Sequence, residues 1–139
     1  MIEQYQAGYG KIVTGMRTIA VVGMSPKPTR PSHQVAQYLI DQGYTVFPVN
    51  PGHESIMAMP CYPDLQSIPA QIDIVDIFRN PKDVPAVVDS AIEIGAKIVW
   101  MQLGIVHEAA AAKARSAGLV VVMDRCIKLD HQDWSFNRL

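Results

Sequence analysis

Thr18-Ile19-Ala20-Val21-Val22-Gly23-Met24-Ser25-Pro26-Lys27-Pro28-Thr29-Arg30-Pro31-Ser32 is the stretch that decides the fold. Its first five residues are mostly apolar and β-branched, which suits a strand buried on both faces. Gly23 ends the run, and a loop of small residues, prolines and two cations follows. A helical pattern begins at Ser32. A strand, a small-residue loop and a helix start together form the corner that holds phosphates in parallel α/β sheets.

The rest of the chain alternates strand-like and helix-like patterns. Short apolar runs predict further strands at 44–49, 72–78, 97–101 and 119–123. Apolar residues at helical spacing predict helices at 32–42, 83–94 and 107–117. Ser32 is the expected N-cap of the first of these helices. This order implies βαβ units, and therefore one α/β domain: a Rossmann-like, doubly wound, mainly parallel five-stranded sheet flanked by helices.

Three segments frame the expected domain organisation. Residues 1–17 are expected to form an N-terminal helical extension, with its helix near 3–17, although Gly8, Gly10 and Gly15 weaken the helical pattern. Residues 18–131 form the Rossmann-like domain, and 132–139 a C-terminal tail. The segment 53–71 is irregular and rich in proline. The end of the chain from 124 onward is expected to form turns and at most one short helix.

Bulk composition limits the class of function. The chain has 139 residues, 49% hydrophobic and 18% charged, enough for one domain with a real core. Its formal net charge of −1 gives no reason to expect nucleic acid or an anionic membrane as partner. No run is long enough to cross a bilayer, and the N-terminus lacks the features of a signal peptide. A cytoplasmic location is therefore expected, and the two cysteines do not suggest a disulfide scaffold.

Candidate binding residues follow from topology, because ligands of such sheets lie beyond the carboxyl ends of the strands. The polar residues and glycines at those ends are Gly23, Ser25, Lys27, Arg30, Asn50, Arg79, Asn80, Gln102, Gly104, Asp124 and Arg125, with Pro51 beside Asn50. Surface loops often carry Lys and Arg. However, Lys27, Arg30 and Arg79 gather at the predicted ligand end, and the guanidinium fork matches a phosphate. A phosphorylated ligand is the favoured interpretation.

The dinucleotide fingerprint is incomplete. It requires G-x-G-x-x-G and an acidic residue at the end of the second strand. The loop here has one glycine, Gly23, and the second strand ends in Val49-Asn50-Pro51 without a carboxylate. NAD and FAD are therefore disfavoured, although Asn50 can still bond to a sugar, base or phosphate.

A known family shares the combined motifs of this chain. They are Val21-Val22-Gly23-x-Ser25-x-x-Pro28-x-Arg30-x-Ser32, Val49-Asn50-Pro51, Asp76-Ile77-Phe78-Arg79, Trp100-Met101-Gln102-Leu103-Gly104-Ile105 and Asp124-Arg125-Cys126-Ile127-Lys128. They resemble the small stand-alone CoA-binding proteins, which are similar to the N-terminal CoA-binding domain of the succinyl-CoA synthetase alpha subunit. The resemblance covers roughly residues 15–131.

The resemblance implies binding of coenzyme A through its adenine nucleotide part. Gly23, Ser25 and Arg30 would hold phosphates. Asn50, Pro51, Phe78 and Arg79 would border the nucleotide, and Gln102 and Gly104 would lie near the pantetheine arm. Two departures stand out: the synthetase loop is richer in glycine, and the synthetase domain with the phosphorylated histidine has no counterpart in this length. A complete ligase reaction in one chain is therefore not supported.

No other residues form a convincing catalytic group. Cys126 with Asp124 and His131 could be drawn as a nucleophile and base, yet a free thiol is the better interpretation for it and for Cys61. His33, His53, His107 and His131 lack metal-ligand spacing. Asp73 and Asp76 fall on opposite faces of their strand, which argues against a paired acid and base.

The sequence thus favours a non-catalytic protein that binds CoA or acyl-CoA. Two alternatives stay open: the CoA-binding half of an acyl-CoA ligase that needs a partner chain, and a nucleotide-binding regulatory module. A homodimer and a ligase-like partner subunit are both compatible with the sequence.

Overall fold

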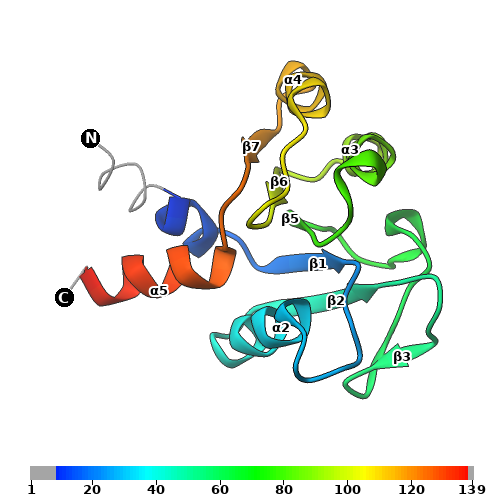
Figure 1. The fold of residues 1–139 in the computed structure, drawn as a ribbon, viewed down its shortest axis with the longest axis vertical. Helices are drawn as coiled ribbons and strands as arrows, with labels where there is room; N and C mark the ends of the chain where they lie inside the picture. Colours follow the sequence, from blue (N-terminus) through cyan, green and yellow to red (C-terminus); the bar gives the residue numbers. More distant parts are fainter. Residues whose placement is uncertain (1–8, 138–139) are drawn as a thin grey trace.

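The computed structural model describes residues 9–137, and its centre is a five-stranded parallel sheet (Figure 1). The strands are β1 (Thr18–Val22), β2 (Thr45–Val49), β5 (Ile74–Ile77), β6 (Ile98–Met101) and β7 (Val120–Val122). Their order in space is β2-β1-β5-β6-β7, and every neighbouring pair is parallel. The doubly wound α/β fold predicted from the sequence is confirmed.

Helices cover both faces of the sheet. They are α2 (Pro31–Asp41), α3 (Val84–Glu93), α4 (Glu108–Ser116) and α5 (Ile127–Asn137), and residues 9–14 are also helical. Helices α3 and α4 pack together over one face, and α2 and α5 lie over the other (Figure 1). Alternation along β5 supplies both cores: Ile74 faces α2, whereas Val75 and Ile77 face α3. All three side chains are fully buried, as expected for a central parallel strand.

Three expectations about where helices lie are corrected. Ser32 is not the N-cap of α2, because Arg30 occupies that position and Ser32 lies inside the first turn. The helix expected at 3–17 covers 9–14 among the described residues, and residues 1–8 lie outside them. The end of the chain is a regular helix of 11 residues, α5, and not mainly turns. Because α5 ends at Asn137, the expected boundary between 131 and 132 falls inside it.

The segment between β2 and β5 contains two short strands that the sequence did not predict, and a helical turn that the sequence of residues 62–65 indicates a few residues earlier. Strands β3 (Ser55–Ile56) and β4 (Met59–Pro60) form a small antiparallel hairpin. A 3₁₀ turn, η1 (Leu65–Ser67), follows and is capped by the Asp64 carboxylate, which accepts from the Ser67 N–H at 2.9 Å. These elements bring residues 62–65 back to the end of β2, where Asn50 N–H donates to the Tyr62 carbonyl.

Candidate functional site

The carboxyl ends of β1 and β5 mark the switch point of the sheet. The chain leaves β1 through α2 toward β2 on one side, whereas β5 lies on the other side of β1. The connections therefore diverge above these two strands and leave a crevice between them. The loops that follow β1, β2, β5 and β6 surround this crevice, so the topology gathers the predicted site residues at one end of the sheet.

Gly23 joins the loops after β1 and β5. Its N–H donates to the Val49 carbonyl at 2.8 Å, and its φ is +86°, in the left-handed region that favours glycine. A Cβ atom at this position would overlap the carbonyl oxygen of Phe78 and lie 2.9 Å from the Arg79 side chain. Glycine is therefore needed here for close packing of two main chains, and this packing fixes Arg79 beside the end of β1.

The loop after β1 is held by two serines. Ser32 Oγ accepts from the Ser25 N–H at 2.9 Å, and Ser25 Oγ accepts from the Lys27 N–H at 3.1 Å. Ser25 and Ser32 thus use their hydroxyls to shape the loop. Lys27 and Arg30 are exposed, and Arg30 makes no side-chain cap.

The first turn of α2 offers few main-chain donors. Pro31 has no N–H, and the N–H groups of His33 and Gln34 both donate to the Arg30 carbonyl. Ser32 N–H is the remaining donor of this turn among the described residues. Anion binding here would depend more on the Lys27 and Arg30 side chains than on the helix start.

Asn50 ties the loop after β2 to the loop after β1. Its side-chain amide donates to the Met24 carbonyl at 3.0 Å, and its Oδ1 accepts from the Gly52 N–H at 3.1 Å. Asn50 therefore positions both loops. Pro51 lies beside it on the rim of a groove.

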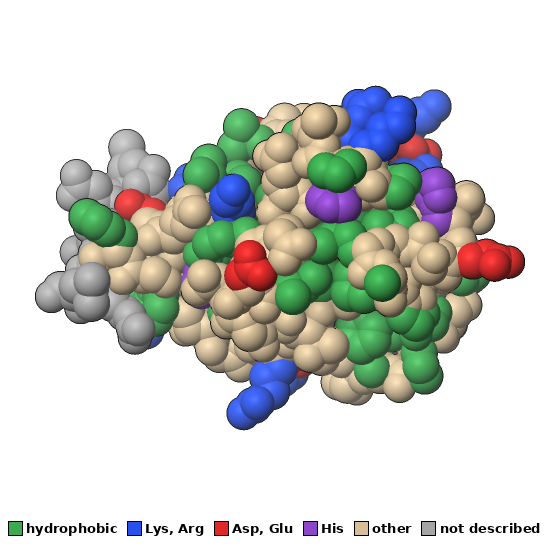
Figure 2. All heavy atoms as spheres, turned by 90° about the horizontal axis from the view of Figure 1, so that it is seen from below, with side chains coloured by type: hydrophobic (Ala, Val, Ile, Leu, Met, Phe, Trp, Pro, Cys, Tyr) green, Lys and Arg blue, Asp and Glu red, His purple; other side chains and the backbone are tan. Residues whose placement is uncertain are grey.

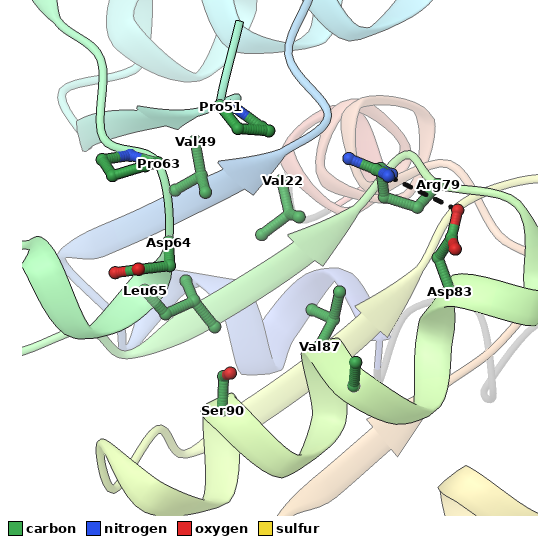
Figure 3. A pocket seen from close by; sticks show the side chains of 11 residues that line it. Val22, Val49, Pro51, Pro63, Asp64, Leu65, Arg79, Asp83, Val87 and Ser90 are labelled. Carbon is green, nitrogen blue, oxygen red and sulfur yellow. Dashed lines mark hydrogen bonds and ion pairs between the residues drawn. The ribbon is translucent and has the colours of Figure 1, made fainter.

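That groove, of about 240 Å³, opens between the end of β2 and α3 (Figure 3). Its walls are mostly apolar, and Val22, Val49 and Val87 point into it. Arg79 stands at one end, where its Nη2 lies 3.4 Å from Asp83 Oδ2. Both side chains of this pair are more than a third exposed, so the ion pair is weak and leaves the guanidinium open to a ligand.

A second hollow, of about 410 Å³, is also lined by Arg79. It lies between the loops after β5 and β6, and Phe78, Asn80, Gly104 and Ile105 line it. Gly104 has a φ of +82° and open space where a side chain would be. Arg79 therefore lines both the apolar groove and a hollow that reaches the loop after β6.

The side chain of Gln102 is buried and hydrogen-bonds within the protein. It is 4% exposed, and its side-chain oxygen accepts from the Ile127 N–H at 3.2 Å, at the start of α5. It thus supports the loop after β6 from within the protein. Trp100, two residues earlier, is fully buried, and its indole N–H donates to the Arg125 carbonyl at 2.8 Å.

The two carboxylates of the third predicted strand have opposite environments. Asp76 is fully buried without a hydrogen-bond partner, and burial raises its pKa well above the ordinary value. Burial also acts to raise the pKa of Asp73, but hydrogen bonds from the N–H groups of Arg17 and Thr18 and the charge of Lys97 outweigh it, so the pKa is lowered.

The two cysteines are not linked by a disulfide bond. Cys61 and Cys126 are free thiols, and burial raises the pKa of Cys61 while its hydrogen bond to Asn50 opposes the change. Within residues 9–137, no group of three or more His, Cys, Asp or Glu side chains is placed to hold a metal ion. Over the same part of the chain, no helix is long and apolar enough to span a membrane.

Lys and Arg side chains are concentrated in one area of the face formed by α2 and the β3–β4 hairpin. Figure 2 shows Lys and Arg gathered at one corner of this face and standing singly elsewhere. The corner lies on the side toward which the β1 and β2 arrows point in Figure 1. This is not the broad basic face typical of nucleic-acid-binding proteins.

Sequence reasoning missed half of the groove. Pro63, Asp64 and Leu65 come from the irregular segment, where no pattern pointed to a site. Asp83, Val87 and Ser90 lie on α3 or just before it at spacings of four and three, which is one face of a helix. That spacing is visible in the sequence, but topology points only to the loops directly after the strands.

Comparison with known proteins gives consistent matches. A family model described as "CoA binding domain" matches residues 17–132. An uncharacterized Bacillus subtilis protein, YneT, is 37% identical over 121 residues, which are 87% of this chain and 90% of that protein. A solved structure of a hypothetical protein from Pyrococcus horikoshii has 40% identity and a TM-score of 0.90, covering 94% of this chain and 92% of that one.

A larger protein contains a related segment. The Archaeoglobus fulgidus protein named acetate–CoA ligase (ADP-forming) I is 34% identical over 83 residues, which are 60% of this chain. They are only 12% of the ligase, so this chain corresponds to a small part of that protein.

Proposed function

This chain belongs to the CoA-binding domain family, and we propose from that premise that it binds coenzyme A at the carboxyl ends of β1, β2, β5 and β6. The observation that carries the proposal is the position of Arg79. It lines both the apolar groove of about 240 Å³ and the hollow of about 410 Å³, close to the loop after β1. An adenine nucleotide with a long flexible arm needs two cavities joined at a phosphate-binding group.

The groove suits the adenine ring. Val22, Val49 and Val87 offer apolar surfaces for its faces, and Pro51 closes one side. Ser90 and Asp83 supply polar atoms at the margin. Mostly apolar walls with a few polar groups are typical of nucleotide and cofactor pockets.

The phosphates would lie along the loop after β1. Arg79 and Arg30 are the guanidinium donors, and Lys27 adds a third cation on the same loop as Arg30. Gly23 allows the loop after β5, which carries Arg79, to come close to the loop after β1. Ser25 shapes the loop after β1 through its bond to the Lys27 N–H. Because the chain carries a net charge of −1, such a local cluster is the source of affinity for an anion.

The pantetheine arm would continue into the hollow beyond Arg79. Phe78 and Asn80 form its near side, and Gly104 with Ile105 its far side. Gln102 holds the far loop in place through its bond to Ile127.

A cytoplasmic location is part of the proposal, since both cysteines are free.

A thermal-shift series tests the proposal. A ligand that binds the native fold raises the melting temperature by mass action. We expect a rise with CoA, a smaller one with dephospho-CoA and none with NAD at equal concentration, with ATP and acetyl-CoA as further comparisons. Arg30→Ala should weaken CoA binding by about 1.5–3 kcal/mol, as for a lost charge-assisted hydrogen bond. A clear rise with NAD and none with CoA would refute the proposal.

The similarity to a ligase supports a second candidate function. A related segment occurs as 12% of an ADP-forming acetate–CoA ligase, so this chain could serve as the CoA-binding part of a ligase formed with another chain. Co-purification with a synthetase-like subunit, and acyl-CoA formation only when both chains are present, would support it. If no such partner is found, the first proposal stands, in which the protein binds CoA without a ligase partner.

A further inference from the structure

A third hollow, of about 340 Å³, lies between the loop after β6 and the first turns of α5. Two of its lining side chains are large, apolar and exposed: Leu103 is 66% and Leu129 56% exposed. Cys126 also lines the hollow and is partly exposed. Exposed apolar side chains around one hollow indicate a binding surface.

The charged groups in this hollow already have partners within the protein. Arg125 donates twice to Asp130, at 2.7 Å in both bonds. Asp124 Oδ1 accepts from the Gly104 N–H at 2.6 Å, and Asp133 is also engaged. A charged ligand would have to displace these bonds. An apolar ligand would only need to cover the leucines, so the hollow favours an apolar ligand.

The hollow and the proposed pantetheine hollow are lined by neighbouring residues of the loop after β6. Gly104 and Ile105 line the hollow assigned above to the pantetheine arm, and Leu103, the preceding residue, lines this one. A Cβ built on Gly104 would meet no atom within 4 Å. A chain leaving the pantetheine hollow can therefore cross the loop at Gly104 without meeting a side chain.

We propose that this hollow binds the acyl chain of an acyl-CoA thioester, and that the protein prefers thioesters with an apolar chain to free CoA. The inference rests on the proposed CoA site, because the pantetheine arm must end near Gly104. The acyl chain covers Leu103 and Leu129, and the Arg125–Asp130 pair stays intact beneath it. No covalent step is involved.

Calorimetric titration of the whole chain with CoA and with hexanoyl-CoA tests the inference. Each fully buried methylene contributes about fourfold in affinity, so partial burial of the chain should make hexanoyl-CoA bind at least about tenfold more tightly. Leu129→Ser should remove most of this difference and leave the affinity for CoA unchanged. Phe136→Ser is the matched control: Phe136 lies on the same helix, is 77% exposed and does not line the hollow. It should keep the full difference.

The outcomes separate the two proposals. Equal affinity for CoA and hexanoyl-CoA overturns the acyl site while CoA binding stands. A preference for hexanoyl-CoA that survives Leu129→Ser also overturns it, because the chain then lies elsewhere. Failure of both ligands to bind overturns the CoA site and the acyl site together. Melting temperatures of the variants without ligand verify that these exposed substitutions leave the fold intact.

Discussion

Gly23 and Phe78 touch through their main chains at the point where β1 and β5 end. The space that a Cβ of residue 23 would fill is taken by the Phe78 carbonyl oxygen, which itself cannot move without shifting β5. The Phe78 N–H donates to the Val22 carbonyl at 2.8 Å, so both sides of the contact belong to the sheet. The glycine thereby sets how close Arg79 comes to the loop after β1.

Gly23→Ala is therefore expected to destabilise the protein strongly. The substitution adds strain at a φ of +86° and a clash with main-chain atoms. We expect a loss of at least about 3 kcal/mol in the free energy of unfolding, measured by urea denaturation. Gly43→Ala is the matched control, because Gly43 has a φ of +96° but no atom within 4 Å of its added Cβ. It should lose only about 1–2 kcal/mol. Equal losses in the two variants would show that the contact with Phe78 contributes nothing.

The sheet could be predicted because its strands are continuous apolar runs between turn residues. The same reasoning failed for α5, whose buried positions include Asp130 and His131, while Leu129 and Phe136 face solvent. The buried Asp130 carboxylate accepts hydrogen bonds from the Arg125 guanidinium, and His131 contacts the Tyr38 hydroxyl. A helix that buries polar side chains beside Ile127 and exposes some of its apolar ones does not show the expected hydrophobic pattern.

The β3–β4 hairpin was missed for a different reason. Its turn residues, Met57 and Ala58, have φ values of 54° and 59°. Such turns normally contain Gly, Asn or Asp, and their absence removed the usual signal. Residues 63–65, which follow the hairpin, supply one wall of the groove. The loops after the strands could therefore be predicted from topology, whereas this wall could not.

Asp76 is expected to make stability fall as the pH rises. Burial raises its pKa in the folded protein, so the folded state keeps a proton that the unfolded chain releases above about pH 4. Between that pH and the raised pKa, the free energy of unfolding should fall by about 1.4 kcal/mol per pH unit. Asp76→Asn removes the titration and should flatten this slope and raise stability at pH 7. Urea denaturation between pH 4 and pH 8 measures both; parallel profiles for the two proteins would contradict the assignment.

Asp73 should show the opposite behaviour and so serves as the comparison. Its pKa is lowered in the folded protein, because the bonds from Arg17 and Thr18 and the Lys97 charge outweigh the effect of burial. The charged form therefore stabilises the fold above the unfolded pKa, and this stabilisation is lost as the pH falls through the folded pKa. Asp73→Asn should be less stable than wild type at pH 7, and the difference should shrink below about pH 4. A difference that persists unchanged in acid would show that the charge is not its origin.

Asn50 should support both stability and ligand binding. Its side chain bonds to the Met24 carbonyl and the Gly52 N–H, one on each side of the proposed nucleotide site. Asn50→Ala should lower the free energy of unfolding by about 1–2 kcal/mol and weaken CoA binding, since the loop after β1 loses its anchor. Asn80 follows β5 and makes no side-chain cap, so Asn80→Ala should leave stability unchanged. If both substitutions affect the melting temperature equally, the bridge made by Asn50 has no special role.

Arg79 gives the most direct test of the site, because it separates binding from folding. Its ion pair with Asp83 is exposed and long at 3.4 Å, so Arg79→Ala should change the melting temperature little. If its guanidinium contacts a phosphate of CoA, the same substitution should weaken CoA binding by about tenfold to a hundredfold. The wild-type affinity should also fall more steeply with added salt than that of the variant. Arg115→Ala, which removes an exposed cation from α4, controls for the change in net charge and should bind CoA like wild type. Calorimetric titration at two salt concentrations measures all three proteins; equal losses for Arg79→Ala and Arg115→Ala would mean that general charge, and not a phosphate contact at Arg79, attracts the ligand.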